Sequence, residues 1–185
     1  LFSTSEEQLI LIADGTYCYC QKSSNNIFQR KSYSVQKGTH LVKPFVICLA
    51  DGHIIDIYGL FEASKNDASI IIEIFESHKD LCNLIKHNDI IILDRGFRDS
   101  ISFLENNYRL ITKSRWVVEV INSFLKKSFK AISRVKNNSL SHIIYDFKIA
   151  GSLINRYFKR LFSDKDDFNE IVNNIKLKLN DNNHN

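Results

Sequence analysis

The sequence has no methionine, a single proline and only six glycines among its 185 residues. So little proline and glycine excludes a collagen-like chain and a Pro/Gly-rich disordered chain. Because a translated protein normally begins with methionine, a chain that starts at Leu1 is expected to be a fragment or an excised domain. No apolar run reaches the roughly 18–20 residues of a membrane-spanning helix, and no signal peptide opens the sequence. An intracellular protein without a membrane partner is therefore expected.

Cysteine is scarce as well, and its spacing is uninformative for metal binding. Cys18, Cys20, Cys48 and Cys82 form neither a C-x-x-C pair nor zinc-finger spacing with the six histidines. A disulfide framework is not expected at this length and spacing. The cysteines are predicted to be buried free thiols in a reducing compartment.

The net charge of +4 is distributed unevenly along the chain. Residues 1–112 hold 11 Lys and Arg against 14 Asp and Glu, a net charge of −3, whereas residues 113–185 hold 14 against 7, a net charge of +7. An acidic half beside a basic half suits a protein that gathers carboxylates in one place and binds a polyanion elsewhere. A solvated basic helical tail is the alternative explanation of the same pattern.

What is present is enough apolar sequence, 44% of the residues, to bury one core. Apolar and alternating runs predict strands at residues 9–13, 17–21, 43–49, 54–60, 89–93 and 109–111, with a hairpin at Asp51-Gly52. Helical spacing predicts helices after Asn66 and at residues 101–106, 114–129, 140–162 and 166–179. The polar segment 23–38 is predicted to be a loop or an irregular hairpin. This order predicts an α/β fold, a mixed sheet flanked by helices.

Two aspartates, Asp14 and Asp94, each end an apolar strand. If the two strands are neighbours in the sheet, both carboxylates emerge at the same edge, where ligands of open α/β sheets bind. Two like charges held close together are costly unless a cation neutralises them, and Mg²⁺ or Mn²⁺ prefers such oxygen ligands. The alternative is that each aspartate only caps a turn or a helix.

A third acid lies on the predicted helix at residues 114–129. Its apolar face is made by Val117, Val118, Val120, Ile121, Phe124 and Leu125. The opposite face carries Arg115, Glu119, Asn122, Lys126 and Lys130. Glu119 is thus the only acid in a basic stripe, and it either points at a metal while its neighbours bind phosphates or forms a routine surface pair with Arg115.

Two arginines, Arg95 and Arg98, follow Asp94 directly, with Gly96 between them. Guanidinium groups match the geometry of phosphate, so these residues suit phosphate binding beside a carboxylate pair. Salt bridges to neighbouring acids would use the same residues.

Read in order, these motifs resemble the catalytic domain of DDE-superfamily transposases, the Harbinger-like and related endonucleases encoded by transposable elements. The resemblance covers roughly residues 9–129. It rests on the segments IADGT (12–16), KPFV (43–46), DGHI (51–54), KNDA (65–68), DRGFRD (94–99), TKSRWVVE (112–119) and NSFLK (122–126).

The resemblance implies a ribonuclease H-like fold with Asp14, Asp94 and Glu119 as the acidic triad. Two divalent ions, Mg²⁺ or Mn²⁺, would serve phosphodiester hydrolysis and strand transfer on DNA. Arg95, Arg98, Arg115, Lys126 and Lys130 are the expected DNA-binding residues. Asp67 also matches a family position, as a structural or helix-capping residue.

The resemblance further implies a nuclear protein, with a DDE endonuclease domain at residues 1–135 and a helical C-terminal extension at residues 136–185. A separate or missing DNA-binding domain and a second copy of the chain are further partners that it leaves open. The segment between Asp94 and Glu119 is shorter than the family usually keeps. Two functions therefore stay open: an active nuclease, or a domesticated or decayed relative that binds DNA or a protein without catalysis.

Overall fold

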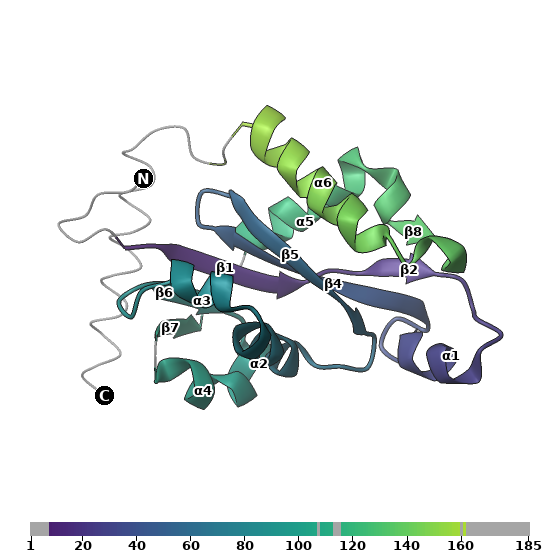
Figure 1. Ribbon diagram of the computed structural model, residues 1–185, viewed down its shortest axis with the longest axis horizontal. Helices are drawn as coiled ribbons and strands as arrows, with labels where there is room; N and C mark the ends of the chain where they lie inside the picture. Colours follow the sequence, from purple (N-terminus) through teal and green to yellow (C-terminus); the bar gives the residue numbers. More distant parts are fainter. Residues whose placement is uncertain (1–7, 107, 113–115, 160, 162–185) are drawn as a thin grey trace.

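The computed structural model describes residues 8–106, 108–112, 116–159 and residue 161 (Figure 1). The strands are β1 Ile10–Gly15, β2 Cys18–Cys20, β3 Tyr33–Ser34, β4 Thr39–Leu49, β5 Ile54–Glu62, β6 Ile90–Leu93, β7 Arg109–Thr112 and β8 Arg134–Val135. The α-helices are α1 Asn26–Ser32, α2 Asp67–Ser77, α3 Lys79–Leu84, α4 Ile101–Glu105, α5 Trp116–Ser128 and α6 Ile143–Tyr157. Short 3₁₀ helices occupy Arg95–Ser100, Lys130–Ile132 and Asn137–Ser139.

The strands form one mixed sheet, which confirms the predicted fold class. Its order is β7-β6-β1-β4-β2-β8, with β3 and β5 also paired to β4. Strands β6 and β7 run parallel to β1, whereas β4 runs antiparallel to it. The long strand β4 pairs with β1 through residues 45–49 and with β2 through Leu41 and Val42. Strands β1 and β2 therefore pair with successive parts of the same strand, β4.

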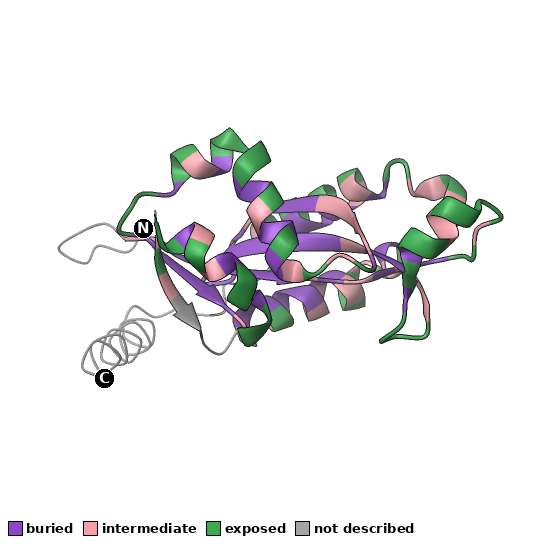
Figure 2. Ribbon diagram, turned by 90° about the horizontal axis from the view of Figure 1, so that it is seen from below, coloured by how far each residue is buried: buried purple, intermediate pink, exposed green. Residues whose placement is uncertain are grey.

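Helices cover both faces of the sheet (Figure 2). Alternate residues of the central strands β1, β4 and β6 enter two separate cores. Ile10 and Ile12 of β1 face the core that contains the buried side chains of α5 and α6. Leu11 and Ala13 face the core that contains α2 and α3. This alternation follows from the two-residue repeat of a strand.

The predicted turn signals are confirmed at two places. In the β4–β5 hairpin, Gly52 has φ of +88°, and Asp51 accepts a hydrogen bond from His53 N (2.9 Å). At the start of α2, the side chain of Asn66 accepts a hydrogen bond from Ser69 N (2.7 Å). The four cysteines are free thiols, as predicted, but only Cys18, Cys20 and Cys48 are buried, whereas Cys82 is half-buried. Burial raises the pKa of Cys18 to about 12.

The prediction for residues 23–38 is wrong, because this segment contains helix α1 and strand β3. The side chain of Asn25 caps α1 by accepting hydrogen bonds from Ile27 N (3.0 Å) and Phe28 N (3.1 Å). Phe28 packs against the core, while the other residues of the helix, apart from Ser32, are exposed or half-buried. So short a helix with so few apolar residues shows no helical periodicity, and its cap holds it instead.

Helix α3 was not predicted, whereas α6 confirms the prediction of a helix after residue 140. Phe147 and Ile154 of α6 lie in the same core as α5. The helix predicted at residues 166–179 lies outside the described residues, and the division of the chain at residue 135 stays a prediction. None of the helices in the described part is long and apolar enough to cross a bilayer.

Candidate active site at the strand ends

Asp14 and Asp94 lie at the ends of neighbouring parallel strands. The register of β1 and β6 aligns Ile10 with Ile90 and Ile12 with Ile92. Each aspartate comes two residues after the aligned pair Ile12 and Ile92. The adjacency that the sequence analysis required is therefore present, and both aspartates reach the same edge of the sheet.

The two aspartates also belong to the same face of the sheet. Ile12 and Ile92 both enter the core beneath α5. Because side chains alternate along a strand, positions 14 and 94 share that face. Asp14 is buried, with 7% of its surface exposed, and Asp94 is half-buried. Asp94 also caps the following 3₁₀ helix by accepting a hydrogen bond from Arg95 N (2.6 Å), so the capping role is real too.

Helix α5 covers this face and carries Glu119 in its first turn. Val117, Val118 and Ile121 are buried against the sheet, as the predicted apolar face requires. Glu119 is exposed. The prediction for Asn122 is wrong: it was placed on the polar face, but it is buried at 8% exposure. The helix sits deep enough on the sheet for its flank, and not only its apolar stripe, to be covered.

The candidate side chains at this edge carry the type of ligand atom that a hard divalent cation prefers. All three candidate side chains offer carboxylate oxygens, the ligands that Mg²⁺ and Mn²⁺ prefer. Two buried oxygens near these acids, Thr16 Oγ1 and Asn122 Oδ1, have no hydrogen-bond partner within the described part of the chain. Such atoms call for a water, an ion or a ligand. Within the described residues, however, no three His, Cys, Asp or Glu side chains gather closely enough to hold a metal ion. The structure thus pairs the two aspartates by strand register and does not gather Glu119 with them.

The predicted DNA-binding residues differ in how far they are described and exposed. Arg95 and Arg98 are exposed on the 3₁₀ helix that follows Asp94, and Lys130 is exposed after α5. Arg115 lies outside the described residues.

Lys126 is half-buried, and its ammonium group lies 5.5 Å from the centre of the Tyr17 ring. Burial lowers the pKa of Lys126, while the nearby Cys18 thiol and Asp14 carboxylate act in the opposite sense. This lysine is therefore electrostatically coupled to one of the candidate acids.

Two contacts of Tyr17, the residue three positions after Asp14, were not predicted from the sequence. Lys37, from the β3–β4 turn, also lies over the Tyr17 ring, at 5.2 Å from its centre. No local pattern connects residues 17, 37 and 126, so the sequence held no signal for this arrangement.

Asp67 also lies beside the end of β1. The Lys43 ammonium group is 3.3 Å from Asp67 Oδ1 and donates a hydrogen bond to the Lys65 carbonyl (2.7 Å). A Cβ atom on Gly15 would come within 3.1 Å of Asp67 Oδ1. These contacts agree with a structural role for Asp67, which fastens the start of α2 to the sheet.

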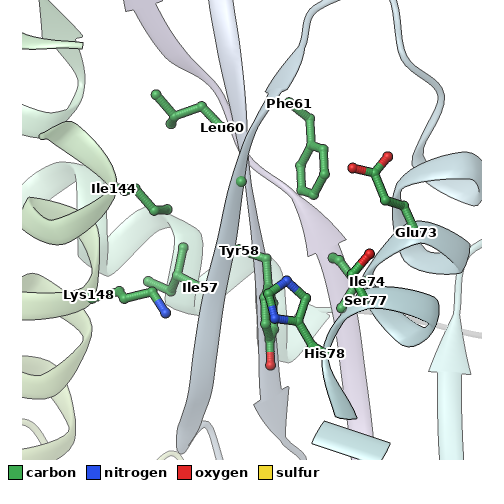
Figure 3. Close-up of a pocket in the computed structure, with 11 residues that line it drawn as sticks. Ile57, Tyr58, Leu60, Phe61, Glu73, Ile74, Ser77, His78, Ile144 and Lys148 are labelled. Carbon is green, nitrogen blue, oxygen red and sulfur yellow. The ribbon is translucent and has the colours of Figure 1, made fainter. Parts of the chain in front are cut away.

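A different cavity, of about 390 Å³, lies at strand β5 between α2 and α6 (Figure 3). The rings of His78 and Tyr58 contact each other there at a tilt of 54°, with centres 4.6 Å apart, and Lys148 pairs with Asp56 at 2.8 Å. Its one lining carboxylate, Glu73, is paired with Lys65. The cavity is separated from β1 by β4, and its charged groups are already paired, so it does not offer a set of carboxylates for a metal.

Comparison with known families adds an independent finding. Residues 13–155 match the family described as DDE superfamily endonuclease. No curated protein and no solved structure matches significantly. The matched region contains β1, β6 and α5, and the mixed sheet with flanking helices is that of a ribonuclease H-like DDE domain. From this match over most of its length, the chain belongs to the DDE superfamily endonucleases.

Proposed function

We propose that this chain is a metal-dependent DNA endonuclease of the transposase type, which hydrolyses phosphodiester bonds and transfers DNA strands through Asp14, Asp94 and Glu119. The observation that carries the proposal is the register of β1 and β6. It aligns the two aspartates at one edge of the sheet and on one face. Neither the match to the family nor the sequence pattern alone supplies that alignment.

The residues at this edge have distinct tasks. Asp14 and Asp94 would hold the cation from the sheet, and Glu119, in the first turn of α5, would be the third ligand. Two divalent ions, Mg²⁺ or Mn²⁺, supply Lewis-acid polarisation of the phosphate when bound. The burial of Asp14 keeps one carboxylate largely out of water, which strengthens its attraction for a cation.

The arginines on the 3₁₀ helix hold the DNA backbone. Arg95 and Arg98 are exposed within four residues of Asp94, and guanidinium groups bind phosphate oxygens in a forked geometry. Lys126 and Lys130 extend the positive charge along α5 and beyond it. From the resemblance to transposases, we also propose that the protein works in the nucleus.

A second candidate function is DNA or protein binding without cleavage, in a domesticated or decayed relative. It is favoured by one observation: within the described part of the chain, the three acids do not form a metal-sized group. The short segment between Asp94 and Glu119 is consistent with it, because that segment sets where α5 begins. The two candidates share the fold and differ in turnover.

The test is cleavage of supercoiled DNA by the purified 185-residue chain with Mn²⁺. The proposal expects nicked and linear products, and their loss in Asp14→Asn, Asp94→Asn and Glu119→Gln. The matched control is Glu76→Gln, which removes an exposed carboxylate from α2 on the other face of the sheet. Intact DNA in every sample would favour the second candidate, as would equal products from the wild type and Asp14→Asn.

A further inference from the structure

Two cations flank a single tyrosine beside the carboxylate edge. Tyr17 follows Asp14 by three residues, and both Lys37 and Lys126 lie over its ring, at 5.2 and 5.5 Å from the centre. The two lysines come from the β3–β4 turn and from α5. An ammonium group held over an aromatic ring is attracted by the ring quadrupole and loses part of its freedom. The tyrosine therefore fixes two positive charges next to Asp14.

A third cation–π contact lies two residues further along the chain, at Tyr19. The guanidinium of Arg134, on the neighbouring strand β8, lies 5.6 Å from the centre of the Tyr19 ring. Residues two apart in a strand are separated by roughly 6.6 Å. That spacing is of the order of the distance between successive phosphates along a nucleic acid strand.

Beyond β2 the positive charge continues into a groove of about 920 Å³ beside α1. Lys22, Arg30 and His40 line it, together with the hydrogen-bonding side chains of Asn26, Gln29 and Tyr33. The described residues that line this groove include no Asp or Glu. The neighbouring Lys31 is already paired with Glu62 at 2.6 Å, whereas Arg30 faces the groove.

The groove lies at the end of the sheet to which β1 points. Strand β4 pairs with β1 at Phe45 and with β2 at Leu41, and then reaches the groove at Thr39 and His40. Helix α1 sits at that end in Figure 1. The turn that carries Lys37 also supplies Val35 and Gly38 to the groove wall. The cations over Tyr17 and the groove are thus parts of one surface.

We propose that this surface, the cationic track formed by Lys126, Lys37, Arg134, Lys22 and Arg30, binds the DNA that flanks the cleaved bond. The inference rests on the proposed function, since it takes DNA as the substrate. From Asp14 to Lys22 the chain spans at most roughly 26 Å. At 3.4 Å per nucleotide of one strand, this stretch corresponds to at most about eight nucleotides.

The charges explain why such a track is needed. A phosphate that approaches Asp14 and Asp94 is repelled by both carboxylates until a metal ion is present. Cations placed beyond the acids attract the DNA backbone and offset that repulsion. DNA is the partner that fits this surface, because cations lie over Tyr17 and Tyr19, and the groove beyond them adds Lys22 and Arg30 beside hydrogen-bonding side chains.

The experiment measures binding of a labelled 20-base-pair DNA duplex to the 185-residue chain in EDTA, by fluorescence anisotropy. Lys22→Gln/Arg30→Gln removes two cations from the groove, and Lys37→Gln removes one from the Tyr17 ring. The control, Lys79→Gln/Lys86→Gln, removes two exposed lysines near α3, at the end of β6 opposite to Asp94. The four residues substituted in the groove variant and the control are exposed: Lys22, Arg30, Lys79 and Lys86. Both variants are therefore expected to fold, and circular dichroism checks this.

The groove variant is expected to raise Kd about tenfold at 50 mM salt and to reduce the salt slope by about 2. Lys37→Gln should raise Kd about threefold, and the control should stay within about twofold of the wild type. A duplex shortened to four base pairs should bind weakly and respond little to the groove substitutions. An equal loss in the control, or an unchanged salt slope in the groove variant, would overturn the track.

Competition separates DNA from other polyanions. DNA should displace the labelled duplex better than an equal length of double-stranded RNA or than polyglutamate, and stronger displacement by either would overturn the assignment to DNA. Binding is measured in EDTA, which prevents metal-dependent cleavage, so binding and cleavage are tested separately. A chain that binds DNA along the track in EDTA but does not cut it with Mn²⁺ would refute the proposed nuclease and leave the track standing. A chain that cuts DNA but binds it equally well without the groove cations would refute only the track.

Discussion

The carboxylate edge, formed by Asp14 and Asp94, and the cationic track lie at the same end of one sheet and carry opposite charge. The edge is built by strand register, with buried or half-buried acids on parallel strands. The track is built by side chains from five separate segments, mostly at the surface. This contrast teaches that chemistry and affinity can be assigned to different parts of the molecule. A change in one should leave the other measurable.

The two regions meet at Lys126. Its ammonium group lies over Tyr17 and is coupled electrostatically to Asp14. A cation so close to a candidate metal ligand partly offsets the charge of that carboxylate before metal binds. Lys126 is therefore the one track residue whose substitution is expected to affect both functions.

The largest expected effect comes from Asp14→Asn, which keeps the size of the side chain and removes its charge. Cleavage should fall at least about a hundredfold, since a metal ligand is lost, whereas DNA affinity should change less than about threefold. Plasmid cleavage in Mn²⁺ and duplex binding in EDTA measure the two quantities. A comparable loss of affinity would mean that the edge and the track are not separable.

The second prediction concerns the core that both regions share. Phe147 of α6 is fully buried in the core beneath the sheet, so Phe147→Ala should lower the free energy of unfolding by about 3–5 kcal/mol. Urea denaturation measures the change. When the Phe147→Ala variant is warmed, its DNA cleavage and its DNA binding should be lost together, at a lower temperature than in the wild type. If only one of them fell, the two regions would not depend on the same sheet.

The third prediction uses the lowered pKa of Lys126, which burial causes. The ammonium group loses its charge as pH rises through that lowered pKa, before an ordinary lysine does, and DNA affinity should fall over the same range. Affinity measured from pH 7 to 10 tests this, with Lys126→Arg expected to remove the fall. For stability the sign is the reverse: the unfolded chain binds the proton more tightly, so rising pH favours the folded state.

The smallest effect is expected from Asn25→Ala, which removes the cap of α1. Loss of the hydrogen bonds to Ile27 N and Phe28 N should cost about 1 kcal/mol of stability. Because α1 lines the groove, DNA affinity should fall slightly and cleavage chemistry should not change. Thermal unfolding and anisotropy measure both, and a loss of cleavage larger than the loss of binding would contradict the assignment.

The same contrast explains how much could be predicted from the sequence. The strands that end at Asp14 and Asp94, and the apolar face of α5, follow from local periodicity, and the structure confirms them. Helix α1 could not be predicted, because a cap and a single half-buried phenylalanine hold it. The stack of Lys37 and Lys126 on Tyr17 joins residues more than a hundred positions apart. The burial of Asn122 depends on how deeply α5 settles on the sheet, which periodicity does not encode.

The most direct test of the central claim is Mn²⁺ binding by the intact chain, followed by electron paramagnetic resonance of the free ion. The account predicts that the wild type and the Glu76→Gln control bind Mn²⁺ equally. Asp94→Asn removes the charge but keeps an oxygen that can accept the cap hydrogen bond from Arg95 N, so it should lose that binding while keeping its fold by circular dichroism. Binding that is unchanged in Asp94→Asn, or absent from the wild type, would contradict a metal site at the ends of β1 and β6.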